Sequence, residues 1–281
     1  MRKRCQVTKM ALKASYKDYV TENGEDIDRN LGINLEKTRA NDPLELWKLW
    51  VLANFYQRVS EATSEKRFRE ISNDSLIFNP QRIHFLTKKS PCLFLRDHTS
   101  IHLCDWKNSS RVCKFNHKQC VVQLLSGTLR KHPHYKKISK TLIASSVFLS
   151  AFDYSLFKLY QHYRAETTNV LKGFCGNING EKIPSLFLVW MSNQNLFGSW
   201  KLDPNLFFPI DLNIRRVCYS LFSIREQSQI LNKISSLRKR LNLDNRVIEL
   251  GLLNVGQKYC RKNEKLCSSC FFSSNGDVRY G

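Results

Sequence analysis

The stretch that decides the fold reads DPLELWKLWVLANFYQR and runs from Asp42 to Arg58. Asp42 is a good N-cap, Pro43 suits the first helical position, and Glu45 stands where a capping box needs a carboxylate. Apolar residues then recur with the period of an α-helix, at Leu44, Trp47, Val51, Leu52 and Phe55. The stretch therefore predicts a helix that packs against a core.

Other stretches of the chain show the same helical period. Helical patterns are predicted over Ser64–Ile71, Ile138–Tyr163, Glu181–Met191, Leu212–Phe222, Gln227–Asn242 and Asp244–Gly256. Residues 84–125 differ, because short β-branched or aromatic runs are broken there by Pro, Asn and Ser, which indicates an irregular or small β insertion. The fold class is therefore mainly α. This pattern excludes a doubly wound α/β enzyme, and no phosphate-binding Gly-rich loop is found.

The charge is strongly positive and uneven. The 281 residues include 45 Lys and Arg against 24 Asp and Glu, a net charge of +21. Residues 81–170 carry 15 basic and 4 acidic residues, and residues 171–281 carry 16 and 8. Such a field attracts polyanions, and nucleic acid is the commonest of these. A hydrophobic share of 42% excludes a disordered basic tail. A lysine-rich solvated surface and an acidic membrane surface stay open as alternatives.

The compartment is predicted to be intracellular, since the N-terminus has no secretory signal and the chain has no apolar run of about 18 residues. The first acidic residue is Asp18, so a mitochondrial transit peptide also stays open. Ten cysteines in a reducing compartment are more often metal ligands than disulfides.

Three motifs carry chemistry. Cys260, Cys267 and Cys270 lie close together near the C-terminus, which suits an iron–sulfur cluster or zinc. The string PIDLNIRRV at 209–217 places Asp211 at the mouth of a predicted helix. The string NGEKIPSLF at 179–187 is a glycine turn that opens a helix, with Lys182 in its first turn.

In this order the three motifs resemble the helix-hairpin-helix/Gly-Pro-Asp superfamily of DNA glycosylases, on its endonuclease-III-like, iron–sulfur branch. The resemblance covers residues 171–272 and extends more weakly to the helix at 42–58. It implies two helical domains, residues 1–41 with 205–281 and residues 42–204, with duplex DNA as the partner of a monomer. It also implies that a damaged or mismatched base is flipped out of the duplex and excised in base-excision repair.

The resemblance assigns roles residue by residue. Asp211 matches the catalytic aspartate, which stabilises positive charge on the sugar as the base leaves. Lys182 matches the lysine that attacks C1′ in members with AP-lyase activity, which forms a Schiff base and permits β-elimination. Contacts with the DNA backbone are implied for Asn179, Gly180, Arg215, Arg216, Lys258, Arg261, Lys262 and Lys265.

The chain departs from the family pattern at several places, among them the hairpin and the cysteine motif. Ile178 occupies the first glycine position of the hairpin, and Gly276 stands where the fourth cysteine of a [4Fe-4S] cluster belongs. Cys5 is the candidate for the missing ligand, since the N-terminus lies beside the cluster domain in this family. Cys218 is interpreted as an ordinary buried cysteine.

A second metal site is considered in the insertion. Cys104, Cys113, His117 and Cys120 have spacings compatible with a structural zinc, and buried cysteines are the alternative. The basic segment that follows is either a DNA contact or a solvated linker, and it contains Lys131, His132, His134, Lys136 and Lys137.

Three functional hypotheses follow. The first is a DNA N-glycosylase with AP-lyase activity. The second is a non-catalytic DNA-binding relative with the same fold. The third is a zinc-dependent nucleic-acid-binding module built on the insertion.

Overall fold

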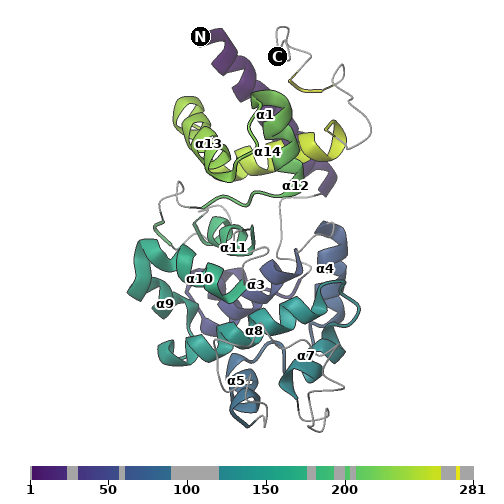
Figure 1. Ribbon diagram of the computed structural model, residues 1–281, viewed down its shortest axis with the longest axis vertical. Coiled ribbons are helices and arrows are strands. Elements are labelled where there is room, and N and C mark those ends of the chain that lie inside the picture. Colours follow the sequence, from purple (N-terminus) through teal and green to yellow (C-terminus); the bar gives the residue numbers. More distant parts are fainter. Residues whose placement is uncertain are drawn as a thin grey trace. The chain divides into compact units, whose positions relative to one another are not determined.

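The structure of the protein is a computed structural model that describes residues 2–23, 31–56, 61–89, 120–175, 182–192, 200–202, 207–260 and 270–272. Within these residues the chain is mainly helical and contains no β-strand (Figure 1). The helices are α1 (Arg2–Asn23), α2 (Leu35–Arg39), α3 (Pro43–Phe55), α4 (Glu61–Glu70), α5 (Pro80–Lys89), α7 (Val121–Leu129), α8 (Tyr135–Leu149), η3 (Ser150–Phe152), α9 (Leu156–Tyr163), η4 (Arg164–Glu166), α10 (Thr167–Cys175), α11 (Lys182–Ser192), α12 (Leu212–Phe222), α13 (Gln227–Leu241) and α14 (Asn245–Lys258).

The chain divides into two compact units. The terminal unit consists of Met1–Asp26 and Asp203–Gly281, and the central unit is the continuous segment Ile27–Leu202. The first boundary therefore lies earlier than the one we expected at residue 41. The reason is local, because the backbone N–H of Asn34 donates to the Glu45 carboxylate at 2.9 Å and so ties the segment before α3 to that helix.

Helix α3 begins as predicted. The Asp42 carboxylate accepts the backbone N–H groups of Leu44 and Glu45, each at 3.0 Å. The expected capping box does not form, because the N–H of Asp42 already donates to the Lys37 carbonyl. Glu45 instead accepts the N–H of Asn34 and pairs with Lys48 at 2.7 Å.

The faces of α3 also differ from the prediction. Leu44 was expected in the core, but its side chain is 53% exposed. All residues from Glu45 to Phe55 are buried except Lys48, so α3 is covered on nearly all sides. A helix with this much apolar surface belongs in the centre of a unit.

A second buried helix packs against α3. All residues of α11 from Ile183 to Met191 are buried. The rings of Trp50 and Phe187 meet edge to face with centroids 5.5 Å apart. The indole N–H of Trp50 also donates to Ser145 of α8 at 3.0 Å. Large aromatic side chains therefore join α3, α8 and α11 into the core of the central unit.

The single helix predicted over Ile138–Tyr163 is broken in two. Helix α8 ends at Leu149, and after the short η3 turn Asp153 and Tyr154 both have a positive φ. Left-handed residues end a helix because they turn the chain away from its axis. The hydroxyl of Tyr154 lies 2.8 Å from Nδ1 of the buried His84, which anchors the break to α5.

The predicted β insertion is wrong at both of its ends. Residues 84–89 belong to α5 and residues 121–125 belong to α7. Both helices bury residues at helical spacing, such as Ile83 with Thr87 and Val121 with Leu125. The rest of the proposed insertion, residues 90–119, lies outside the described residues.

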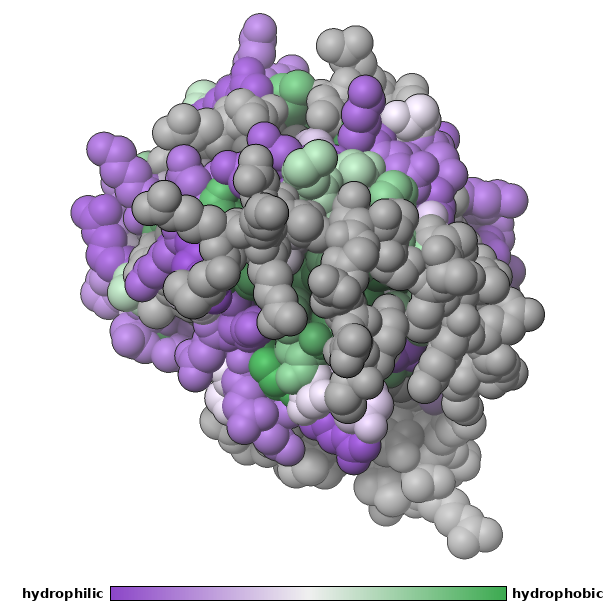
Figure 2. Space-filling model, turned by 90° about the horizontal axis from the view of Figure 1, so that it is seen from above, coloured by the Kyte–Doolittle hydropathy of each residue, from purple (hydrophilic) through white to green (hydrophobic). Residues whose placement is uncertain are grey.

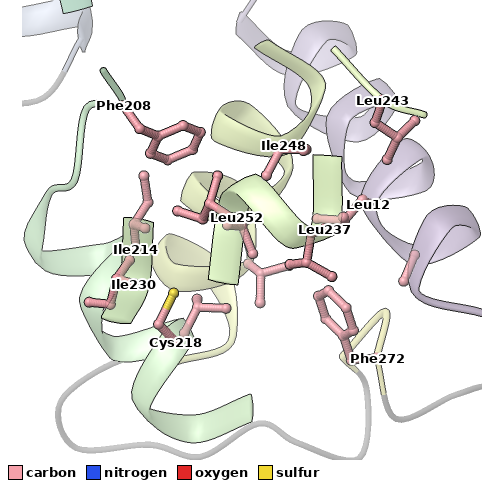
Figure 3. Close-up of a cluster of buried hydrophobic side chains, with 14 of the residues drawn as sticks. Leu12, Phe208, Ile214, Cys218, Ile230, Leu237, Leu243, Ile248, Leu252 and Phe272 are labelled. Atoms are coloured by element: carbon pink, nitrogen blue, oxygen red, sulfur yellow. The ribbon is translucent and has the colours of Figure 1, made fainter. Parts of the chain in front are cut away.

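The terminal unit is built on a helix that the sequence patterns missed. Helix α1 buries Ala11, Leu12, Ser15 and Tyr19 as a narrow stripe, while most of its other residues are charged or polar. It packs along α14, which in turn packs on α12 (Figure 1). Figure 3 shows the apolar core that results, with Leu12, Cys218, Ile230 and Leu252 among its labelled side chains.

Two glycines of α14 permit this packing. A Cβ atom at Gly251 would lie 2.8 Å from the Leu12 carbonyl oxygen of α1, and one at Gly256 would lie 2.7 Å from the Asn213 carbonyl oxygen of α12. Both positions therefore need a residue without a side chain, so that the backbones of neighbouring helices can approach.

One side of the described surface is largely hydrophilic. On the side that Figure 2 shows, hydrophilic side chains predominate and hydrophobic ones form small groups between them. No single helix of the described residues is long and apolar enough to cross a membrane. By length and composition alone, one pair bent by 69° (Tyr135–Phe152 with Leu156–Cys175) meets the criteria for a span.

Candidate functional site

Lys182, the predicted nucleophile, is the first residue of α11 and is half-buried. Its Nζ donates a hydrogen bond to the main-chain carbonyl of Tyr56 at 3.1 Å. Within the described part of the chain it forms no ion pair with a carboxylate. The amine is therefore held in place by a neutral acceptor, which leaves its charge uncompensated at short range.

The carbonyl that holds Lys182 belongs to the C-terminal end of α3. The neighbouring carbonyl of Phe55 accepts hydrogen bonds from the Ser64 hydroxyl at 3.0 Å and from Nε2 of His132 at 2.9 Å. Carbonyls at the end of a helix lack intrahelical partners and carry partial negative charge, so they favour donors and cations. Lys182 therefore also has a structural task as a partner of this helix end.

Asp211, the predicted catalytic acid, is the N-cap of α12. One carboxylate oxygen accepts the N–H of Ile214 at 2.8 Å, and the other accepts a long hydrogen bond of 3.4 Å from the Asn213 side chain. The group is half-buried. Its second oxygen is thus weakly engaged.

Asp211 is positioned by α14. The close approach of Gly256 to the Asn213 backbone brings α14 against the first turn of α12. This contact lies two residues along the chain from Asp211. Gly256, four residues before Cys260, therefore helps to place the N-terminus of α12, which Asp211 caps. Nothing in the sequence alone connects these two positions.

The two arginines that follow Asp211 are both half-buried. Arg215 donates to the side chain of Gln227 on α13. Arg216 forms no hydrogen bond or ion pair within the described residues. Arg216 therefore keeps a guanidinium group for an external acceptor, whereas Arg215 already has an internal one.

Lys258, which the resemblance assigned to the DNA backbone, is engaged inside the terminal unit. Its Nζ lies 2.7 Å from the Asp18 carboxylate and also pairs with Glu22, both on α1. Asn254 adds a hydrogen bond to Asp18 at 2.8 Å. Hydrogen bonds from Lys258 and then from Asn254 lower the pKa of Asp18, against a smaller opposing effect of burial.

These contacts form one polar seam between two parallel helices. The hydroxyl of Ser15 donates to the Gly251 carbonyl at 2.9 Å, and the Asn254 side chain donates to the Ser15 carbonyl at 3.0 Å. The residue numbers of the paired residues increase together along both helices, from Ser15 with Gly251 to Glu22 with Lys258. Helices α1 and α14 therefore run in the same direction. The predicted list of site residues contained only Lys258 from this seam.

The cysteines are only partly described. Cys260 is half-buried and Cys270 is buried at the edge of the terminal core. Cys267 and Gly276 lie outside the described residues, as does the side chain of Cys5. Among the residues that are described, no group of three His, Cys, Asp or Glu side chains could hold a metal ion.

Cys218 is buried in the same core, and burial raises the pKa of its thiol to about 12. This agrees with its interpretation as an ordinary core cysteine. Of the second metal site, Cys120 is half-buried before α7, and the other members lie outside the described residues: Cys104, Cys113 and His117.

The basic segment after α7 is not a uniform surface. His132 is buried at the end of α3, and burial lowers its pKa despite the hydrogen bond to Phe55. Lys131 pairs with Glu70 at 3.3 Å. His132 is therefore part of the packed interior rather than of a solvated basic surface. The remaining predicted backbone contacts lie outside the described residues, and these are Asn179, Gly180, Arg261, Lys262 and Lys265.

Comparisons of the chain with protein-family models, with curated protein sequences and with solved structures gave no match. Its function must therefore be argued from the chemistry of its own residues.

Proposed function

We propose that the protein is a DNA base-excision glycosylase with AP-lyase activity. The observation that carries the proposal is Lys182, a half-buried primary amine that a main-chain carbonyl positions and that no carboxylate of the described residues neutralises. A weakly engaged carboxylate at a helix N-terminus, Asp211, supports it. The net charge of +21 supports a polyanionic substrate.

The proposed reaction balances with these two groups. The unprotonated amine of Lys182 attacks C1′ of the damaged nucleotide, and the bond from C1′ to the base breaks as the base leaves with its electron pair and takes up a proton. The bond from C1′ to the ring oxygen O4′ then breaks, O4′ takes up a proton, and the opened sugar is joined to Lys182 as a protonated Schiff base. The Schiff base makes the hydrogen at C2′ acidic, water takes this proton, and the electron pair left at C2′ expels the 3′ phosphate by β-elimination. The resemblance assigns to the Asp211 carboxylate, which belongs to the terminal unit, the stabilisation of the cationic sugar during base departure.

Trapping tests the lysine. Incubation with duplexes that contain abasic sites or common damaged bases, followed by borohydride, is expected to leave a covalent protein–DNA adduct. Lys182→Arg keeps the positive charge and a donor for the Tyr56 carbonyl but offers no amine for a Schiff base, so it is expected to give no adduct. Neither base release nor an adduct from the wild-type protein would overturn the enzymatic reading.

A second variant separates chemistry from helix capping at Asp211. Asparagine is as good an N-cap as aspartate, so Asp211→Asn is expected to leave the unfolding free energy within about 0.5 kcal/mol of the wild type. Base release is nevertheless expected to fall by about 10²-fold or more, because the negative charge is lost. Base release that stays unchanged would assign Asp211 to capping only.

The proposal retains a [4Fe-4S] cluster in the terminal unit, with Cys260, Cys267 and Cys270 as ligands. Cys260 and Cys270 border one core, which suits a buried cluster, but the described residues do not complete a ligand set. When bound, a cluster would hold the C-terminal loop in place, and the reaction above needs no step at it. Iron analysis and visible absorption of anaerobically purified protein test this part.

A non-catalytic DNA-binding relative is the second candidate. Its support is that Lys182 and Asp211 each have a structural task, one at the end of α3 and one at the start of α12. It predicts salt-sensitive duplex binding that survives Lys182→Arg, with no chemistry in the wild-type protein. The zinc-module hypothesis depends on residues 90–119, and zinc analysis of the full chain tests it.

A further inference from the structure

The ends of α8 and α9 bring four aromatic side chains into contact. The rings of Phe148 and Phe152 stack with centroids 5.8 Å apart and planes inclined by 25°. Tyr163, at the end of α9, meets these two rings at 6.3 Å and 5.9 Å. The imidazole of His162 lies 5.5 Å from the Phe152 ring. We call Phe148, Phe152, His162 and Tyr163 the α8–α9 aromatic cluster.

The aromatic cluster rests on the core of the central unit and reaches its surface. The Phe148 ring lies 5.1 Å from the ring of the buried Phe174 on α10, which meets Trp50 of α3 edge to face at 6.4 Å. Phe148 is nevertheless 38% exposed and His162 is exposed, while the other two members are half-buried. Contiguous apolar area at a protein surface indicates a binding site, whereas exposed apolar residues that lie singly do not.

The backbone is strained at both edges of the aromatic cluster. Asp153 and Tyr154, directly after Phe152, have φ angles of 52° and 59°. Arg164, directly after Tyr163, has a φ of 49° with a ψ of −115°. Side chains other than glycine rarely adopt a positive φ, and residues that are held there gather at ligand-binding sites. The fold therefore retains two unfavourable turns where the rings meet.

The unit that carries the aromatic cluster is positive whichever ion pairs form within it. Residues 27–202 contain 26 Lys and Arg against 13 Asp and Glu, so a net charge of +13 stays even if every carboxylate is paired. Around the cluster, residues 135–175 contain six basic and two acidic residues. Of the two acids, Asp153 pairs with Lys158, and Glu166 accepts a hydrogen bond from Asn169. The charge of the unit thus complements a polyanion.

A ligand that combines flat rings with negative charge matches both properties. Unpaired nucleobases stack on aromatic side chains, and a positive surface attracts the phosphates that link them. A membrane surface is the competing class, because the bent helix pair that meets the criteria for a span includes the aromatic cluster. It matches less well, since α8 buries most of its apolar residues inside the unit and two cluster members carry polar ring atoms.

We propose that the α8–α9 aromatic cluster binds unpaired bases of single-stranded nucleic acid by stacking, with Phe148 and Phe152 as its main contacts. The inference goes beyond the proposed function and requires no step of the glycosylase reaction. An unpaired base on a phosphodiester strand is common to DNA and RNA, and the experiment separates these two sources.

The test compares the affinity of the full-length protein for two fluorescent DNA oligonucleotides of about twelve nucleotides. One carries thymine at every position. The other has the same phosphates but tetrahydrofuran sugars without bases, which cannot form a Schiff base with Lys182. We expect the thymine oligonucleotide to bind about ten- to thirtyfold more tightly, because only its bases can stack. A uracil RNA of the same length shows whether the cluster prefers one sugar.

The aromatic contact is tested with Phe148→Leu combined with Phe152→Leu, which removes two rings and keeps apolar side chains against Phe174. Affinity for the thymine oligonucleotide is expected to fall about tenfold, and affinity for the base-free one should change by less than about twofold. The salt dependence should not change, because no charge is removed.

The matched control is Phe85→Leu, which removes a 54% exposed ring from α5 of the same unit and should bind like the wild type. Thermal unfolding verifies that the variants fold. His162→Ala, at an exposed position, is a second variant that should lose about threefold in affinity for the thymine oligonucleotide alone.

Three outcomes would overturn the inference. Equal affinity of the wild-type protein for the two DNA oligonucleotides would reduce the interaction to charge. An equal loss in Phe85→Leu would show that the effect is not specific to the aromatic cluster. If the Phe148 and Phe152 variant loses affinity for vesicles of phosphatidylcholine and phosphatidylserine but not for the thymine oligonucleotide, the surface belongs to a membrane contact. A protein that binds through the cluster but gives no borohydride adduct would contradict only the proposed enzymatic activity.

Discussion

Each unit contains a helix pair in its core, and the two pairs are held by different means. In the central unit, α3 and α11 meet through large rings, with Trp50 against Phe187 and Tyr56 against Trp190. In the terminal unit, α1 and α14 meet through glycine, serine, asparagine and an ion-pair network. The first pair depends on apolar burial, which is insensitive to pH and salt, and the second depends on close backbone approach and charge.

The comparison extends to the lysine at each pair. Lys182 beside α3 meets a carbonyl, whereas Lys258 at the end of α14 meets two carboxylates. Both lysines resemble functional residues in the sequence, but within the described residues Lys258 is paired with carboxylates and Lys182 is not. A positive charge becomes available to a ligand only where the fold provides no anion for it.

The largest effect is expected from the aromatic contact. Trp50→Ala should lower the free energy of unfolding by about 3–5 kcal/mol, because Trp50 is fully buried and its loss leaves a cavity. Chemical denaturation measures this. The matched control is Leu44→Ala on the same helix, where an exposed side chain should change the free energy by no more than about 0.5 kcal/mol. Equal effects at the two positions would contradict the assignment of the faces of α3.

The next effect concerns the glycine contact of the terminal unit. Gly251→Ala should cost about 1–3 kcal/mol, because its Cβ would lie 2.8 Å from the backbone oxygen of Leu12. Gly127→Ala in α7 meets nothing within 4 Å and should instead stabilise the protein by about 0.5–1 kcal/mol. If both variants shift the denaturation midpoint in the same direction, the close approach of α1 and α14 is not what requires Gly251.

A smaller effect is expected from the ion pair. Its partners lower the pKa of Asp18 in the folded protein, so this group stabilises the fold above the ordinary pKa near 3.8. That contribution is lost as the pH falls through the folded value. Asp18→Asn should cost about 1 kcal/mol or less at neutral pH and should flatten the stability curve below about pH 4. If Asp18→Asn leaves the acid dependence of the unfolding free energy unchanged, the ion pair of Asp18 does not contribute to the stability of the fold.

The smallest effect is expected at His132. Burial lowers its pKa in the folded protein below the ordinary 6.5, although the hydrogen bond to Phe55 opposes this. The unfolded chain therefore binds the proton more readily, and stability should fall as the pH drops below about 6.5 until the folded value is passed. Urea unfolding between pH 7.5 and 5 should show a shallower fall for His132→Gln than for the wild type. The same slope in both proteins would show that other groups cause the fall.

Helices with their own start signals were predicted well from the sequence. Helix α12 has the predicted bounds, Leu212–Phe222, because Asp211 caps it and its apolar residues recur at helical spacing. Helices α13 and α14 agree to within two residues at each end. The apolar pattern failed where helices bury only a narrow stripe, as in α1, or where residues in the left-handed conformation divide a continuous pattern, as at Asp153 and Tyr154.

The candidate site divides in the same way. That Lys182 opens a helix and that Asp211 caps one are local properties, which neighbouring residues in the chain determine. That Lys258 is neutralised, that His132 is buried and that Gly256 meets Asn213 depend on contacts between residues far apart in the chain. A single sequence does not reveal those distances, so they could not have been predicted from it.

By itself, the sequence determined the helical class, the starts of the capped helices and the positive charge, because helix starts, periodicity and net charge depend on residue type and near neighbours. Only the tertiary structure decided which cations pair with a carboxylate and which helices pack with their backbones in close contact. Burial, ion pairing and close packing are properties of neighbours in space, and the folded chain alone brings Asp18 to Lys258 and Leu12 to Gly251.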